Sequence, residues 1–349
     1  MKKVFALLLA LSMVFALCAC GGTAAPAASS APAADKPADA PAAAPADAPA
    51  AVSANLTMGT GSEAGTYYAF GGALGGNIAQ NTDISINVVS SGGSAANITG
   101  IVVEGIYDLA TVQSDVMTYA YNGTNSFADS GKLDGFRVLA GLYAETVQIV
   151  TCDPSIKTVA DLKGKNVCVG DVGSGTYFNS VDILAAYDMT LDDVTAVYQS
   201  FGASTEALKN GQIDAAVITA GAPTPAVSDL SQNKTVYLVS IDDAHMSKLL
   251  AACPWYASYT IPGGTYKGFD DDAVTVTVKA TLVCRADLDD DVAYAIVSTI
   301  FNNVDDITAA HSKGAELSLD FATDGIAVPF AAGAARFFAE NGITVDTAG

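Results

Sequence analysis

Three glycine-rich segments of this chain have the residue types that bind an anion through main-chain amides. They span 59–68, 90–97 and 170–178, and the first and third both contain Gly-Thr-Tyr followed by a second aromatic residue. A glycine turn lets the main chain approach a ligand closely, and the start of a following helix has unpaired N–H groups and a partial positive charge. Together these features predict a cradle for an anion, without any basic side chain.

Hydroxyl and aromatic side chains in the same segments extend this interpretation. The hydroxyls would add hydrogen-bond donors, and the rings of Tyr67 and Phe178 would form apolar walls. A single Gly/Ser/Thr turn before a helix is usually only an N-cap, so the hypothesis requires all three segments to converge on one cleft. The hydroxyls concerned belong to Ser62, Thr66, Ser91, Ser94, Ser174 and Thr176.

The elements that must position these segments form a series of strand–helix units. Short apolar runs predict strands at 55–59, 83–90 and 108–113, with helices at 65–80 and 94–107 between them. In a parallel sheet with right-handed crossovers, every strand-to-helix loop lies on one edge, where ligands of open α/β sheets bind. The first two glycine-rich segments are such loops.

A second series of the same kind begins near Val147 and contains the third segment. A strand at 274–283 leads back out of it, and the apolar spacing then predicts one helix over 289–309. The sequence therefore predicts an α/β fold with two lobes, hinged by two strands, and a cleft between them. We expect the first lobe to contain 54–145 and 285–349, and the second lobe to contain 146–284. Within the second lobe we expect a strand at 166–170, a helix at 176–187 and further βα units through 194–198, 204–210 and 215–219.

The N-terminal sequence predicts export and lipidation. Residues 1–20 combine two lysines with an uncharged run that is too short to span a bilayer, as in a secretory signal peptide. They end in Leu-Cys-Ala-Cys, which resembles the lipobox of bacterial lipoproteins, so Cys20 would become the lipidated N-terminus. Residues 21–53 are mainly Ala and Pro and predict a tether that buries no core. We expect an extracytoplasmic protein anchored to a membrane through lipid.

Composition and missing motifs exclude several classes of function. A formal net charge of −21 argues against nucleic acid as a partner. The chain has no phosphate-binding loop, no dinucleotide fingerprint and no Gly-x-Ser-x-Gly elbow. Its two histidines, His245 and His311, are remote in sequence from the serine-rich loops, and no Cys-x-x-Cys pair occurs. We therefore expect no cofactor, no metal site and no catalysis.

Charged and sulfur-containing side chains leave two points open. None of the three arginines lies in a glycine-rich segment, so a bound anion would be balanced mainly by helix starts and hydroxyls. Beyond the signal peptide the cysteines are Cys152, Cys168, Cys253 and Cys284. If the apolar runs ending at Cys152 and Cys284 lie side by side, a disulfide is possible in an oxidising compartment, although buried free cysteine is the commoner outcome.

Several motifs in this order resemble the TAXI class of solute-binding proteins that serve TRAP transporters. They are Gly59-Thr60-Gly61-Ser62-x-x-Gly65-Thr66-Tyr67-Tyr68, Ser91-Gly92-Gly93-Ser94-x-x-Asn97, Val112-Gln113-Ser114-Asp115, Gly173-Ser174-Gly175-Thr176, Asp214-Ala215-Ala216 and Tyr259-Thr260-Ile261-Pro262. The resemblance implies a type II periplasmic-binding-protein fold that closes on a small organic anion, such as glutamate or a dicarboxylate. It also implies delivery of that solute to TRAP membrane permease subunits driven by an ion gradient.

The same resemblance implies a set of ligand-binding residues from both lobes. The first lobe would contribute Gly61, Ser62, Thr66, Tyr67, Ser91, Gly92, Ser94, Asn97 and Gln113. The second lobe would contribute Ser174, Gly175, Thr176, Thr219 and Gly221. Two alternatives remain: a solute-sensing lipoprotein that reports to a membrane receptor, and an envelope hydrolase, for which the sequence has no activated nucleophile.

Overall fold

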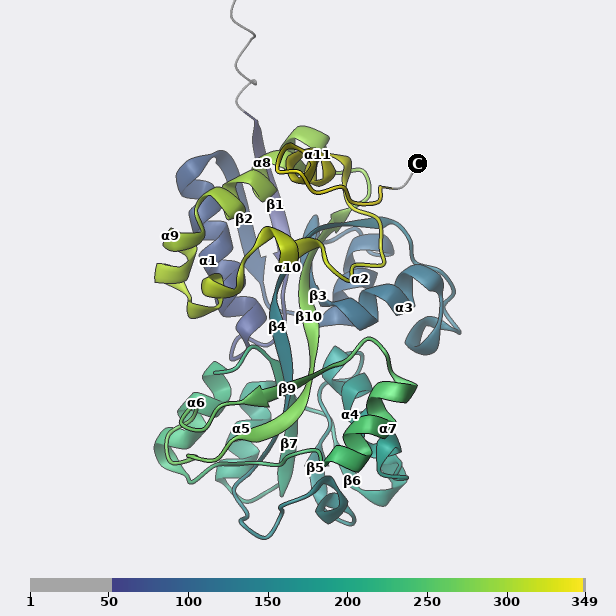
Figure 1. Ribbon diagram of the computed structural model, residues 1–349, viewed down its shortest axis with the longest axis vertical. Coiled ribbons are helices and arrows are strands. Elements are labelled where there is room, and N and C mark those ends of the chain that lie inside the picture. Colours follow the sequence, from purple (N-terminus) through teal and green to yellow (C-terminus); the bar gives the residue numbers. More distant parts are fainter. Residues whose placement is uncertain (1–51, 348–349) are drawn as a thin grey trace, which may run out of the picture. The chain divides into compact units, whose positions relative to one another are not determined.

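The computed structural model describes residues 52–347, so the predicted signal peptide, Cys20 and nearly all of the tether lie outside the described residues. Within them, one mixed sheet of ten strands runs through two groups of helices, seen as the upper and lower halves of Figure 1. The upper half, here the first lobe, has a hydrophobic core drawn from 56–143 and 280–338. The lower half, the second lobe, has two core clusters drawn from 147–278. This is the α/β fold that the sequence predicts.

The first lobe begins with parallel strands in the order β2-β1-β3. Because the strands are parallel, the loops that follow them share one edge of the sheet, which here faces the second lobe (Figure 1). The strands are β1 (Ser53–Gly59), β2 (Asp83–Val89) and β3 (Leu109–Gln113), and the helices after them are α1 (Thr66–Asn81), α2 (Ser94–Val102) and α3 (Ser114–Asn122), followed by the 3-10 turn η1 (Asn125–Phe127).

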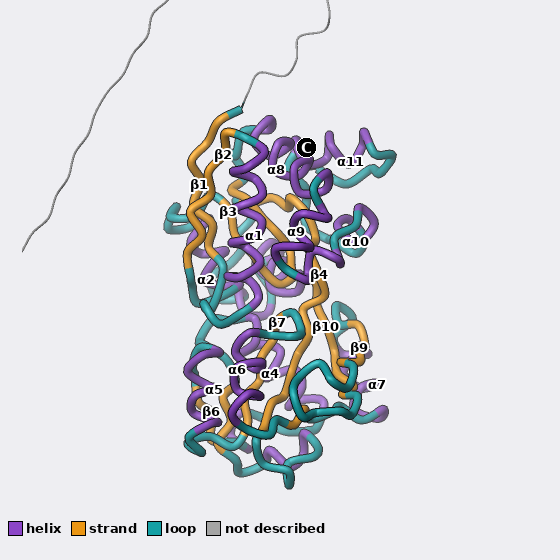
Figure 2. Tube along the Cα trace, turned by 90° about the vertical axis from the view of Figure 1, so that its left-hand side faces the viewer, coloured by secondary structure: helices purple, strands orange, loops and turns teal. Residues whose placement is uncertain are grey.

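Two long antiparallel strands connect the lobes, as Figure 2 shows. They are β4 (Phe136–Thr151) and β10 (Ala273–Arg285). Most of their side chains are buried, which fits apolar runs covered on both faces. Val278 packs in the second lobe and Ala280 in the first. We therefore propose that the chain crosses between lobes at 143–147 on β4 and at 278–280 on β10, rather than at 284.

The second lobe repeats the strand–helix pattern on the other half of the sheet. Its parallel strands β7, β5 and β6 lie in that order beside β4, and β9 pairs with β10. Its strands are β5 (Asn166–Cys168), β6 (Thr195–Val197), β7 (Ala215–Ala220), β8 (Tyr237–Leu238) and β9 (Ala257–Ile261). Its helices are η2 (Val159–Leu162), α4 (Gly175–Ala186), η3 (Leu191–Asp193), α5 (Phe201–Lys209), α6 (Pro225–Asn233) and α7 (Asp243–Ala252).

The C-terminal segment returns to the first lobe and packs around β4 and α1 (Figure 1). It consists of α8 (Asp290–Asn302), α9 (Val304–Ala310), η4 (Ser312–Glu316), α10 (Leu319–Thr323) and α11 (Ala332–Glu340). Within residues 52–347, no helix combines the length and apolar character needed to span a membrane.

Two helices are shorter than the sequence predicts. The helix expected over 289–309 is broken at Asn303, whose side-chain amide donates to the carbonyl of Thr299 at 2.8 Å. Asparagine competes with the helical backbone in this way. The helix expected over 94–107 ends at Val102, because the carbonyls of Thr99 and Gly100 accept from Glu104 and Ile106 and turn the chain out of the helix.

The possible disulfide between Cys152 and Cys284 is absent, and all four described cysteines are free thiols. The strands that carry these two residues do lie side by side, but they are antiparallel. Cys284 pairs with Arg137 near the start of β4, whereas Cys152 follows the last residue of that strand. The two thiols therefore lie at opposite ends of the strand pair, which excludes a bond between them.

Candidate functional site

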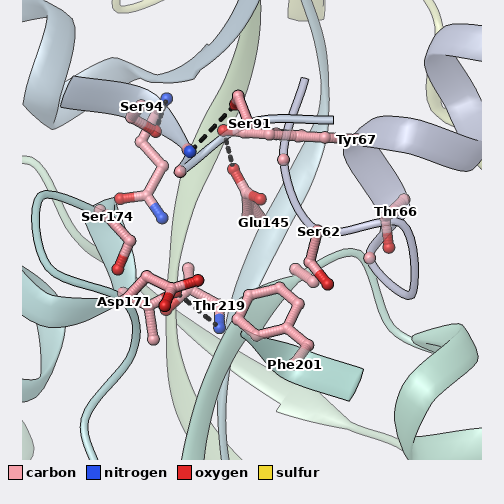
Figure 3. Close-up of a pocket in the computed structure, with 18 residues that line it drawn as sticks. Ser62, Thr66, Tyr67, Ser91, Ser94, Glu145, Asp171, Ser174, Phe201 and Thr219 are labelled. Atoms are coloured by element: carbon pink, nitrogen blue, oxygen red, sulfur yellow. Dashed lines mark hydrogen bonds between the residues drawn. The ribbon is translucent and has the colours of Figure 1, made fainter. Parts of the chain in front are cut away.

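All three glycine-rich segments meet at a small cavity between the two lobes. The cavity has a volume of about 40 Å³, so the lobes leave little more room than a few water molecules need. In Figure 3, Ser91, Ser94 and Tyr67 of the first lobe lie on one side, Ser174, Asp171 and Phe201 of the second lobe lie on the other, and Glu145 lies between them. The full lining is Gly61, Ser62, Gly65, Thr66, Tyr67, Ser91, Gly92, Gly93, Ser94, Gln113, Glu145, Asp171, Ser174, Gly175, Thr176, Phe201, Thr219 and Ala220.

Two helices of the first lobe begin at this cavity without a side-chain cap. The N-cap residues are Gly65 for α1 and Gly93 for α2, and neither helix has an acidic residue in its first turn. Gly93 has φ 94°, a conformation that favours glycine. The first N–H groups of both helices therefore remain available, and the partial positive charge of two helix starts is directed at the cavity.

The second lobe presents a different kind of helix start. Ser174 is the N-cap of α4, and its Oγ accepts from the backbone N–H of Tyr177 at 3.1 Å. Other hydroxyls of the site are also partly used within the protein: Ser91 Oγ accepts from the N–H of Gly93, and Ser94 Oγ accepts from the N–H of Gln113. These bonds fix the loops, and each hydroxyl keeps its proton as a donor for a ligand.

The lobes touch directly around the cavity. Thr66 Oγ1 donates to the carbonyl of Gly221 at 3.0 Å, and the N–H of Ala226 donates to the carbonyl of Ala64 at 3.0 Å. Gly175 lies so close to Gln113 that a Cβ at this position would collide with the Gln113 amide. The structure is therefore a closed arrangement of the two lobes.

Two of the predicted ligand-binding residues do not line the cavity. Asn97 is fully buried, and its amide donates to the carbonyls of Thr60 and Thr111 at 2.7 and 2.8 Å. It holds the first loop against β3 instead of facing a solute. The carbonyl of Gly221 accepts from the hydroxyls of Thr66 and Thr224. The other residues of the predicted ligand-binding set line the cavity, and their contact with a solute is a proposal. Phe178, expected to form an apolar wall, is absent from the lining.

The most informative residue that the sequence analysis missed is Glu145. It is 2% exposed, and its Oε2 accepts from the hydroxyl of Tyr67 at 2.5 Å. Burial raises the pKa of Glu145 well above its ordinary value, while the Tyr67 hydrogen bond lowers it by less. The sequence signal was present: Glu145 is the only charged residue of β4 between Val138 and Thr151.

Two further side chains of the lining were also missed. Asp171 belongs to the third glycine-rich segment, and burial raises the pKa of its carboxyl group. Phe201 begins α5 and brings an aromatic ring to the second-lobe side. Glu145 and Asp171 are the charged side chains of this lining, so the cavity contains carboxyl groups and no basic side chain. Nothing in the sequence of α5 marked Phe201 as a site residue.

The described residues hold no cluster of three His, Cys, Asp or Glu side chains with a geometry suited to a metal ion. The site is therefore built from main-chain amides, hydroxyls, two carboxyl groups and aromatic rings. Such a set can bind a small polar molecule from several directions.

A comparison with solved structures found matches to several binding proteins. MatC from Rhodopseudomonas palustris, solved with bound malate, matches with a TM-score of 0.52 and 16% sequence identity over 74% of this chain and 88% of that chain. The alkanesulfonate-binding protein SsuA from Xanthomonas axonopodis pv. citri, bound to MOPS, has a TM-score of 0.46 and 18% identity over 83% and 85%. An ancestral arginine-binding protein bound to arginine has a TM-score of 0.46 and 16% identity over 74% and 97%.

A comparison with family models gives the relationship by sequence. The model described as the NMT1-like family matches residues 58–342. This match includes all three glycine-rich segments and both strands that connect the lobes. The motifs predict the TAXI class, which is narrower than the family that this match shows. The chain belongs to the NMT1-like family.

Proposed function

We propose that this protein is an extracytoplasmic solute-binding lipoprotein of the TAXI class. It captures a small organic acid in the cavity between its lobes and delivers it to a TRAP-type permease driven by an ion gradient. The membrane anchor in this proposal is the lipid on Cys20, and the tether gives the two lobes reach from the membrane surface.

One observation carries the binding part of the proposal: loops from both lobes line a single cavity, and two strands connect those lobes. A solute that touches both lobes stabilises the closed arrangement relative to an open one, because only the closed arrangement makes both sets of contacts. The described site has donors and shape for binding but shows no nucleophile paired with a base. Capture and release of a solute is the activity that this geometry supports best.

The donors of the first lobe favour a carboxylate. The uncapped starts of α1 and α2 supply N–H groups and partial positive charge, and the hydroxyls of Ser62 and Ser91 stand beside them. A carboxylate accepts several hydrogen bonds at once and needs no basic partner in such a cradle.

The carboxyl groups of the cavity restrict the class of solute further. An anionic group placed directly beside Glu145 and Asp171 would be unfavourable, whereas a protonated amine at that position would donate to Glu145 and balance its negative charge. We therefore propose a solute that carries both a carboxylate and a protonated amine, such as an acidic or neutral amino acid. A dicarboxylate without an amine fits this lining less well.

Thermal unfolding of the full-length protein in detergent micelles tests the proposal. Organic acids and amino acids are added one at a time, and a compound that binds only the folded protein raises the melting temperature. We expect at least one amino acid to do so. A melting temperature unchanged by every compound of both classes would contradict solute capture of this kind.

Gly175→Val tests whether the cavity is the binding site. A side chain on Gly175 would collide with Gln113 across the lobes, so this variant closes poorly and should lose the ligand-induced shift. Gly76→Ala is the matched control, because Gly76 lies on the exposed face of α1 with open space around it. If calorimetry shows that Gly175→Val and Gly76→Ala bind the ligand with equal affinity, the cavity is not the binding site.

A further inference from the structure

The lobes also meet outside the cavity, where α3 of the first lobe faces α4 of the second. A chain of hydrogen bonds crosses this contact. The amide Nδ2 of Asn179 donates to Oδ2 of Asp115 at 3.2 Å and lies 2.7 Å from the hydroxyl of Tyr256. That hydroxyl donates to Oδ2 of Asp182 at 2.9 Å. None of these residues lines the cavity, so the contact is separate from the proposed solute site.

Two oxygen atoms in the middle of this contact lack a hydrogen-bond partner. They are Oδ1 of Asp115 and Oδ1 of Asn179, and both residues are fully buried, at 1% and 0% exposure. Buried acceptors without a hydrogen-bond partner are unfavourable in such a contact. A proton on Asp115 would supply the missing donor, and the neutral carboxyl group would then pair with the carboxamide of Asn179 through both of its oxygens.

The surroundings of Asp115 favour that proton. Asp182 faces it from α4, Tyr256 and Cys253 lie near it in the segment before β9, and Tyr119 lies on its own helix. Glu145 on β4 is close enough for the charge of Asp115 to raise its pKa. Burial is the main cause that raises the pKa of Asp115 to about 7, and the charge of Asp182 adds to it. Backbone N–H groups at the start of α3 oppose the shift.

We propose that Asp115 and Asn179 form a latch that holds the two lobes together when Asp115 is protonated and releases them when it ionises. Opening of the lobes separates α3 from α4 and returns Asp115 to water, where its carboxyl group has an ordinary pKa. Closure therefore takes up a proton. The latch goes beyond the proposed function, since it concerns the closing motion and needs no particular solute.

The direction of the pH effect follows from the two pKa values. The closed state holds the proton more tightly, so closure is most favourable at low pH and weakens as pH rises toward about 7. Between the ordinary pKa of an aspartate and 7, the closing equilibrium falls roughly tenfold for each pH unit. Above that range both states are ionised, and closure no longer depends on this group.

Trp255 gives a direct optical test. It is the only tryptophan of the chain, its ring lies 5.3 Å from that of Tyr119 across the contact, and it packs on the cores of both lobes. We would measure its emission and its quenching by acrylamide in the full-length protein in detergent micelles, without any solute, from pH 5 to pH 8. Quenching should increase and emission should move to longer wavelength as pH rises.

Asp115→Asn is the matched variant, because it keeps the shape of the side chain and is neutral at every pH. It should stay closed, with low quenching at both pH 5 and pH 8. The latch is refuted if quenching of Trp255 in the wild-type protein is the same at both pH values. It is also refuted if quenching rises between pH 5 and pH 8 as much in Asp115→Asn as in the wild-type protein. Since no solute is added, neither result bears on whether the cavity binds one.

Discussion

At the scale of single residues, polar groups buried where the two lobes meet determine which solutes the site can bind. The hydroxyl of Tyr67 donates to Glu145 in the interior, and burial raises the pKa of both groups well above their ordinary values. A protonated amine beside Glu145 would balance the negative charge of the ionised carboxylate. We therefore expect Glu145 to favour solutes with a protonated amine over solutes without one.

Glu145→Gln should remove this distinction. We expect the affinity for glutamate to fall roughly tenfold or more, since a hydrogen bond to a charged group is worth about 1.5–3 kcal/mol. The affinity for glutarate, which differs from glutamate only in lacking the amine, should not fall. Calorimetry with both compounds on both proteins makes the comparison. An equal loss of affinity for glutarate and for glutamate in this variant would show that Glu145 does not bind the amine.

At the scale of secondary structure, a side-chain cap in the local sequence fixes the start of several helices. Asp289 is a clear case: its Oδ1 accepts from the N–H groups of Asp291 and Val292 at 2.9 and 3.2 Å and starts α8. The apolar face of this helix, with Val292, Ile296 and Ile300, is buried as its spacing predicts. The break at Asn303 was missed because the apolar spacing continues through it, while a single side-chain bond to Thr299 ends the helix.

Asp289→Ala should lower the free energy of unfolding by about 1 kcal/mol, because two helix N–H groups lose their acceptor. The neighbouring Asp290→Ala is the control: Asp290 is also exposed and lies in the first turn of α8, so only a few tenths of a kcal/mol are expected from the helix dipole. Urea unfolding of both variants measures the difference. Equal losses would argue that the cap does not stabilise α8.

At the scale of the whole molecule, the proposed function needs two things that lie in different parts of the chain. It requires a cavity between the two lobes that opens and closes, and an N-terminal segment that keeps the protein near a membrane. The cavity is described by the structure, whereas the anchor rests on the sequence alone, since Cys20 lies outside the described residues.

Cys20→Ser should release the protein from the membrane fraction, because a serine at this position cannot be lipidated. Cys18→Ser, two residues earlier, is the matched control and should leave the protein membrane-bound. Fractionation after a high-salt wash, with mass spectrometry of the N-terminal peptide, separates the outcomes. Retention of Cys20→Ser on membranes would refute lipid anchoring at this residue.

The sequence by itself determined the α/β class, the strand–helix units that lead into the site, and the three loops that line the cavity. These follow from patterns within a few residues of each other: apolar periodicity, glycine turns and helix starts. It also indicated that two strands connect the lobes, because a second strand–helix series begins near Val147 and a strand at 274–283 leads back out of it.

Only the tertiary structure decided which side chains face the cavity. Asn97 and Glu145 are both buried polar residues in or beside the lobe contact, yet Asn97 bonds to backbone carbonyls while Glu145 faces the cavity. The antiparallel pairing of β4 and β10 decided that Cys152 and Cys284 are far apart. The latch likewise joins Asp115 to Asn179, residues 64 positions apart. Such choices depend on how distant segments pack, and no local pattern in the chain records that packing.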